Sequence, residues 1–507
     1  MSVSRSKRTA QNLSVGVIYQ FVNMILAFVS RTVFIRTLGD EYLGLNGIFG
    51  DVLTLLSMAD LGFNTAMAYS FYKPLADNDE EKIAELVAFY KKIYNTIALV
   101  VLGLGLCCIP FLRLIVNTEK QIDHLEIYYL FSLAGVVTSY LFVYKTTLLT
   151  ADQKDFKVVN IRMYTSVIKV ALQIVTLFLW KNYILYLAIG TCMGILTNLI
   201  ASRKAEAEYP YIKDLKDKKS NDKDLTGSIV ENMKSVFIYK VSTTVFSATD
   251  NIIISVVINT AMVGLYSNYL LLSQKLLLME QILFSAMTAS IGNVIAKENA
   301  DKRYKVFQTI QSISFIFCGI ITTCYCLMAG DLVRIWLGED HTLPLSLVAA
   351  VSVNTFLACA LQPLWSYRDA SGLYKKTKYI MLVATVENIV LSVILGKIIG
   401  VAGIIFASAI ARLTTYFWVE PKLLYKEYFE RSSRSYFISM LKNLLLAVVS
   451  IVVIGVISSR VYVDSWPKLI VKGAVIGCVC TIVFVGAYYK TEGAQNLIRK
   501  VKEFVKR

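Results

Sequence analysis

The chain has 507 residues, of which 56% are hydrophobic and only 17% are charged, and its formal net charge is +16. Soluble domains carry about 45–50% apolar and about 25% charged residues, so this composition is typical of an integral membrane protein. Seven prolines exclude a fibrous or disordered chain, and two histidines exclude most histidine-dependent catalysis.

Fourteen apolar segments are long enough to cross a bilayer as helices. They are continuous and lack the alternation of barrel strands, so we expect an all-α integral membrane fold. The spans are predicted near residues 13–35, 43–70, 93–112, 125–149, 158–180, 183–202, 235–258, 262–294, 306–329, 343–366, 379–396, 400–419, 437–458 and 469–488.

The distribution of basic residues predicts the orientation of these spans. Arg5, Lys7 and Arg8 precede the first span, and most of the 52 lysine and arginine residues fall in segments on that same side. The positive-inside rule therefore places both termini in the cytoplasm. This positive charge suits binding to anionic lipid headgroups. Nucleic acid is a poor alternative partner, because the sequence has no basic stripe with interleaved aromatic residues outside the spans.

The longest polar stretch, residues 203–234, separates six spans from eight and predicts a cytoplasmic linker. Residues 43–70 also align with residues 263–290, matching Gly44 with Gly264. An even number of spans per repeat predicts two lobes related by a twofold axis along the membrane normal, with the substrate site between them. The expected parts are an N-lobe at 1–202 (helices 1–6), the linker, a C-lobe at 235–420 (helices 7–12), two further helices at 421–490, and a basic amphipathic cytoplasmic tail at 491–507.

Charged residues inside the spans are the informative ones, because each costs roughly 2.5–3.5 kcal/mol at a helix centre. Arg162, Ser166, Lys169 and Gln173 share one face of the fifth span, and Lys240 to Asn251 give the seventh span a polar face. Isolated polar residues can simply hydrogen-bond between helices, and lysines near the ends of spans can snorkel to the surface.

Cations lining a wet cavity suit an anionic substrate such as a pyrophosphate or an acidic sugar. The candidate substrate-binding residues are Arg31, Lys169, Lys240, Asp250, Asn251, Arg36, Asn23 and Gln173, and the candidate ion-coupling residues are Glu387 and Asp60. We expect no cofactor, metal or disulfide, and the residues leave Na⁺ and H⁺ coupling open. No nucleotide-binding or nucleophile motif is present, so we expect a protein that is not an enzyme.

Three stretches carry a family resemblance. RTVFIRTLGDEYLGLNGIFGDVLTLLSMADLGFNTAM, SATDNIIISVVINTAMVGLYSNY and LLTADQK resemble the multidrug/oligosaccharidyl-lipid/polysaccharide exporter superfamily, in particular its Wzx-type flippases. Asp250 matches the acidic position of the T-D-N-I-I-I-S motif, while Arg31 and Arg36 match first-helix basic positions loosely.

The resemblance implies two six-helix lobes with alternating access in a bacterial cell membrane. It implies transport of undecaprenyl-diphosphate-linked oligosaccharide to the outer leaflet for capsule, exopolysaccharide or O-antigen synthesis. A polysaccharide polymerase and chain-length machinery would then be partners.

Other functions stay open at this point. A teichoic-acid or peptidoglycan lipid precursor is an alternative cargo for the same kind of flippase. A cation-coupled multidrug antiporter of the same fold would favour acidic residues in its cavity, whereas lysine and arginine dominate the in-span charges here. A membrane polymerase or sugar transferase would need a large loop outside the membrane, and none is predicted.

Overall fold

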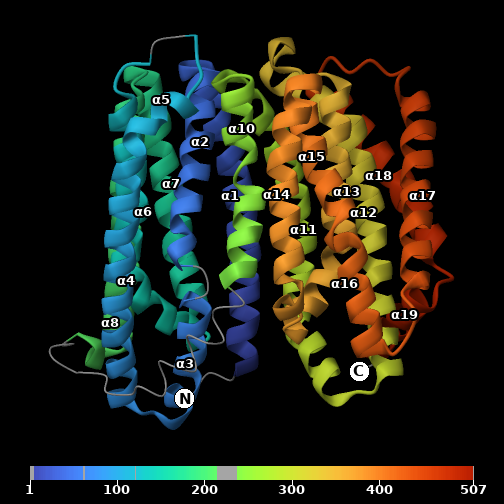
Figure 1. Ribbon diagram of the computed structural model, residues 1–507, viewed down its shortest axis with the longest axis horizontal. Coiled ribbons are helices and arrows are strands. Elements are labelled where there is room, and N and C mark those ends of the chain that lie inside the picture. The colour runs from blue at the N-terminus through green and yellow to red at the C-terminus, as the bar shows by residue number, and fades with distance from the viewer. Residues whose placement is uncertain (1–4, 61–62, 120–121, 214–236, 506–507) are drawn as a thin grey trace. The chain divides into compact units, whose positions relative to one another are not determined.

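The computed structural model describes residues 5–60, 63–119, 122–213 and 237–505, and its regular elements over these ranges are all helical (Figure 1). Within these described ranges, eleven helices are long and apolar enough to cross a membrane. The predicted all-α membrane fold is therefore confirmed, while the count of fourteen spans stays a prediction.

Contacts divide the chain into two compact units, residues 1–264 and 265–507. The segment 237–264 thus packs with the N-terminal helices, although the predicted C-lobe starts at 235. The predicted division into two lobes of six membrane spans each stays a prediction. The first unit contains α1 (Arg5–Leu38), α2 (Asp40–Leu56), α3 (Phe63–Asp77), α4 (Glu80–Cys108), α5 (Leu112–Ile115), α6 (Leu125–Ala151), α7 (Asp155–Trp180), α8 (Tyr183–Glu208), a helical segment at 237–247, α10 (Asp250–Val257) and the start of α11 (Thr260–Lys297).

The second unit continues α11 and packs it with the helices that follow. These are α12 (Ala300–Leu337), α13 (Leu345–Ser371), α14 (Tyr374–Ile399), α15 (Val401–Thr414), α16 (Tyr416–Leu424), the π-helical turn η5 (Tyr425–Phe429), α17 (Arg434–Ser458), α18 (Trp466–Tyr488) and α19 (Glu492–Val505). The predicted amphipathic tail forms α19, which packs on α12: a Cβ on Gly493 would lie 2.3 Å from the carbonyl oxygen of Gln308.

Two pairs of spans are joined by very short turns. Between α7 and α8, Lys181 adopts a left-handed conformation (φ 48°), and the side chain of Asn182 accepts a hydrogen bond from the backbone nitrogen of Leu185 at 3.1 Å. Between α14 and α15, Gly400 has φ 71°, a conformation that glycine adopts without strain. One or two residues are therefore enough to reverse the chain direction.

Two predicted spans that carry candidate residues are interrupted. The second breaks after α2, where a short 3₁₀ turn, η1 (Ser57–Asp60), precedes α3, and the seventh breaks at 248–249, before α10. The hydroxyl groups of Ser57 and Thr249 donate to the carbonyl oxygens of Leu53 (2.7 Å) and Val245 (3.0 Å). Such local bonds compete with the helix ladder. The prediction that one continuous helical face runs from Lys240 to Asn251 is therefore wrong.

Candidate functional site

Arg31 lies near the end of α1 and is half-buried. Its guanidinium interacts electrostatically with Asp40, the first residue of α2, and with Tyr186 on α8. The ring of Tyr186 packs edge-on against Phe34, one turn beyond Arg31, with centroids 5.0 Å apart. Arg31 therefore lies where α1, α2 and α8 meet, and its acidic neighbour offsets part of the cost of a charge in the membrane.

Asp250 and Asn251 are the first two residues of α10, directly after the break in the seventh span. Asp250 interacts electrostatically with Asp51 on α2, and Asn251 hydrogen-bonds the same Asp51 carboxyl. Gly47 lies beside this pair, because a Cβ there would be in van der Waals contact with Asn251 Nδ2, at 3.5 Å. Two neighbouring carboxyl groups with an amide donor form an acidic group that suits a cation or a shared proton.

Asp51 is a residue that the sequence analysis missed. It follows Gly47 by four residues, so both lie on the face of α2 that meets α10. The more evident polar pattern of this span in the sequence passes through Asn46 and Gly50, on another face. The available signal was a glycine followed one turn later by a carboxyl group, a pattern that single-sequence periodicity does not distinguish from chance.

Lys169 and Lys240 are half-buried cations in the first unit. Neither side chain forms a hydrogen bond or an ion pair with any residue that the structure describes. Lys169 lies near the middle of α7, more than two turns from either end. A lysine kept in a span without a protein partner is available to an anion that enters from water.

The remaining candidates of the first unit differ in their surroundings. Gln173 is buried, and its Nε2 donates to the backbone oxygen of Tyr186 at 3.0 Å, which joins α7 to α8. Arg36 is exposed in the last turn of α1, and Asn23 is half-buried on the same helix. The structure thus brings Arg31 and the end of Gln173 toward Tyr186, whereas Arg36 points to the surface.

The two candidate ion-coupling residues lie in different units. Glu387 on α14 is half-buried, and its Oε1 accepts a hydrogen bond from the Thr414 hydroxyl at 2.6 Å. The neighbouring Asn388 is fully buried and donates to Ser408 at 2.8 Å, so this polar pair joins α14 to α15. Asp60 ends the short turn η1, and its side chain lies outside the described part of the structure.

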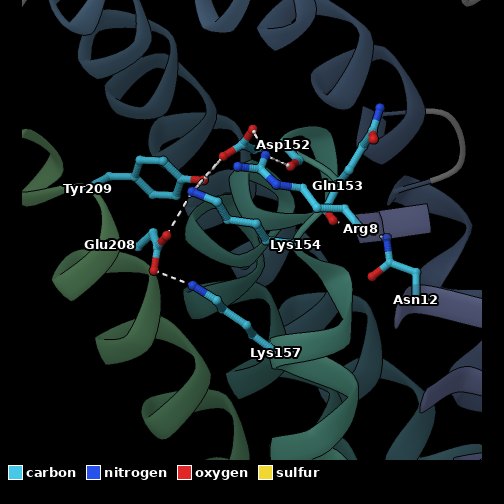
Figure 2. Close-up of polar contacts among 8 residues, drawn as sticks. All are labelled: Arg8, Asn12, Asp152, Gln153, Lys154, Lys157, Glu208 and Tyr209. Carbon is cyan, nitrogen blue, oxygen red and sulfur yellow. Dashed lines mark hydrogen bonds and ion pairs between the residues drawn. The ribbon is translucent and has the colours of Figure 1, made fainter. Parts of the chain in front are cut away.

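A chain of ion pairs holds the expected cytoplasmic end of the first unit (Figure 2). Asp152, in the loop after α6, pairs with Arg8 of α1 at 3.1 Å and with Lys154 at 2.7 Å. Lys154 also pairs with Glu208 at the end of α8, at 2.7 Å, and Glu208 pairs with Lys157 of α7. The LLTADQK motif therefore joins α1, α7 and α8 through alternating charges.

Tyr209 completes this ion-pair chain by donating its hydroxyl to Asp152 Oδ2 at 2.7 Å. Burial alone would raise the pKa of Asp152, but bonds from Lys154 and Tyr209 and the charge of Arg8 together lower it below its usual value. Burial and the Asp152 carboxylate raise the pKa of Tyr209. Asp152 is therefore ionised and Tyr209 neutral at physiological pH.

The opposite end of the unit is closed by a reciprocal glycine contact. A Cβ on Gly44 of α2 would lie 2.1 Å from the backbone oxygen of Thr260, and a Cβ on Gly264 of α11 would lie 2.1 Å from the backbone oxygen of Asp40. Asp40 and Thr260 are the first residues of their helices. Each glycine thus packs against the start of the helix that carries the other.

The loop after α5 adds hydrogen bonds beside this glycine contact. The backbone nitrogen of Thr260 donates to the oxygen of Asn117 at 2.7 Å, and Asn117 Nδ2 donates to the oxygen of Ile258 at 3.1 Å. The Ser255 hydroxyl donates to the oxygen of Ile115 at 2.7 Å. These hydrogen bonds therefore join the loop after α5 to the segment 255–260, which lies far from it in the sequence.

Comparisons with known proteins agree with this architecture. The family model described as "Polysaccharide biosynthesis protein" matches residues 9–297. The structure of "Lipid II flippase MurJ, inward closed conformation" superposes with a TM-score of 0.65 at 15% identity, over 95% of this chain and 99% of that one. An inward-facing multidrug resistance MATE family transporter gives 0.61 at 13% identity, over 85% of this chain and 96% of that one. A search of the curated proteins finds no match.

Proposed function

Because the chain belongs to the polysaccharide biosynthesis protein family, we propose that it is a flippase for undecaprenyl-diphosphate-linked oligosaccharide repeat units. It moves them from the inner to the outer leaflet of a bacterial cell membrane, for capsule, exopolysaccharide or O-antigen synthesis. It acts by changing access to a bound lipid and breaks no covalent bond, so it is not an enzyme.

The observation that carries this proposal is Lys169, a half-buried cation near the middle of α7 that has no partner among the described residues. A diphosphate supplies the charge that such a cation lacks, and hydrogen bonds between charged groups are the strong ones. Arg31 is the second cation that we propose for the phosphate site, because its planar guanidinium suits phosphate oxygens. Asp40 competes with the phosphates for Arg31, so binding rearranges this end of α1.

The closed end of the first unit fits the alternating-access part of the proposal. Gly44, Gly264 and Asn117 tie α2 and the loop after α5 to the start of α11. In the predicted topology these residues lie on the outer side. Release of the sugar outward then requires these contacts to open, and a cargo that binds the open state better drives that change by differential affinity.

A second candidate function is a cation-coupled antiporter of the same fold. The neighbouring carboxyl groups of Asp51 and Asp250 favour it, because such pairs bind cations or share a proton. This candidate predicts that a cationic drug binds to the purified protein and that Asp51→Asn weakens that binding. The flippase proposal predicts no such saturable drug binding.

The test is the affinity of the purified protein for undecaprenyl-diphosphate-linked oligosaccharide, measured in detergent. Lys169→Ala should weaken binding about tenfold or more, because a hydrogen bond to a charged group contributes about 1.5–3 kcal/mol. Lys204→Ala is the matched control, since Lys204 is an exposed cation near the end of α8. Equal affinities for wild type and Lys169→Ala would remove the proposed phosphate site.

A further inference from the structure

Glu280 is a buried carboxyl group that the proposed phosphate site does not use. It lies on α11 within the second unit, and only 1% of its surface is exposed. Its Oε1 is 3.0 Å from the hydroxyl oxygen of Ser314 on α12. The same Ser314 oxygen is 2.7 Å from the backbone oxygen of Cys359 on α13. Three helices thus meet at one hydroxyl group.

Hydrogen counting at Ser314 favours the protonated state of Glu280. A serine hydroxyl has one hydrogen to donate and can also accept. The backbone oxygen of Cys359 can only accept, so the shorter contact takes the Ser314 hydrogen. A carboxyl group that carries a hydrogen completes the set, because it donates to the Ser314 oxygen while Ser314 donates to Cys359. The geometry therefore accommodates the neutral acid.

The surroundings of Glu280 lead to the same state. The titratable group that faces it is the thiol of Cys359 on α13, which is fully buried, hydrogen-bonds the carboxyl group and also contacts the buried thiol of Cys318 on α12. Over the described residues no ion pair involves Glu280. Glu420, in the same unit, shows the contrast, because Arg368 lies 3.1 Å from its carboxylate. A buried carboxylate without a cation is unfavourable, and such groups take up a proton instead.

We propose that Glu280 is a proton-binding site within the second unit, occupied in this conformation and emptied when water reaches it. Release leaves a carboxylate on Glu280 and transfers the proton to water, with no other reactant. The link between this release and lipid movement rests on the proposed flippase function. On that basis Glu280 couples the transport cycle to the proton gradient, because the protonated and ionised forms favour different conformations.

The first test is infrared spectroscopy of the purified full-length protein, which detects the carbonyl stretch of a protonated carboxyl group. We expect that band at neutral pH in wild type, the loss of one component of it in Glu280→Gln, and retention of that component in Glu298→Gln and in Asp51→Asn. Glu298 is the matched control because it directly follows α11 and pairs with Lys302 at the surface, at 2.7 Å. A wild-type spectrum without the band, or a spectrum that Glu280→Gln leaves unchanged, would overturn the proposal.

Ser314→Ala keeps the test decisive if Glu280→Gln does not fold. Removal of the hydroxyl group that Glu280 bonds should shift the frequency of the carboxyl band without abolishing it. An unchanged frequency would contradict the assignment of the band to Glu280. Neither spectroscopic result depends on transport activity, so a protein that moves no lipid would refute the proposed function and leave the proton site in place.

The second test measures coupling in proteoliposomes that contain undecaprenyl-diphosphate-linked oligosaccharide. An imposed pH gradient should change the initial flipping rate of wild type and of Glu298→Gln. The ratio of rates with and without the gradient should become indistinguishable from unity in Glu280→Gln, because a glutamine cannot release the proton. A Glu280→Gln protein that responds to the gradient as wild type does would overturn the coupling.

Discussion

At the scale of single residues, the membrane itself made prediction possible. A charge inside an apolar stretch is rare and costly, so Arg31, Lys169 and Asp250 could be selected from the sequence alone. The partners could not be selected, because periodicity gives the face of a helix and not what packs against it. Asp51 and Glu280 therefore emerged only when α10 and α12 were in place beside them.

Gly44 permits a residue-scale prediction with an internal control. Gly44→Ala places a Cβ 2.1 Å from the backbone oxygen of Thr260, so α2 and α11 must separate. Overpacking of this kind typically costs about 1–3 kcal/mol. We therefore expect a lower melting temperature for the purified Gly44→Ala protein. Gly50→Ala on the same helix meets no atom within 4 Å and should melt at or above the wild-type temperature.

At the scale of elements, helix existence could be predicted and helix interruption could not. Long apolar runs fix where helices form, and the turns at Lys181 and Gly400 need only a left-handed residue. The break before Asp250 has no glycine or proline. At this break, serine and threonine hydroxyl groups donate to backbone oxygens of their own helix. Because serine and threonine also occur in unbroken helices, they do not predict the break from the sequence.

The ion-pair chain of Figure 2 belongs to this scale, because it joins α1, α7 and α8. Asp152→Asn should lower the melting temperature at neutral pH by an amount corresponding to about 1 kcal/mol, since these partly exposed pairs are screened by water. The low pKa of Asp152 means that its contribution is present above the usual aspartate pKa of about 3.9 and is lost as pH falls through its lower folded value.

A pH series of melting temperatures checks this prediction. The difference between wild type and Asp152→Asn should be constant near neutral pH and disappear as Asp152 is protonated, at pH values below the usual aspartate range. Asp77→Asn is the control, because Asp77 is exposed at the end of α3 and forms no ion pair with the described residues. A difference that persists unchanged in strong acid would show that the Asp152 carboxylate does not stabilise the fold through its charge.

At the scale of the whole molecule, the internal repeat has a structural counterpart. Gly44 and Gly264, which the repeat aligns, pack reciprocally against the first residues of α11 and α2. The sequence match at these positions therefore reflects a packing requirement for glycine in both halves. Family membership and this arrangement together support a transport function, whereas the cargo depends on side chains that no family model specifies.

The most direct test of that function is movement of the lipid itself. Purified wild-type protein would be reconstituted into vesicles with fluorescent undecaprenyl-diphosphate-linked oligosaccharide, and an impermeant quencher would report the fraction in the outer leaflet over time. We expect the quenchable fraction to rise far faster than in protein-free vesicles, and Lys169→Ala to reduce this rate about tenfold or more. A wild-type rate equal to that of protein-free vesicles would contradict the proposed function.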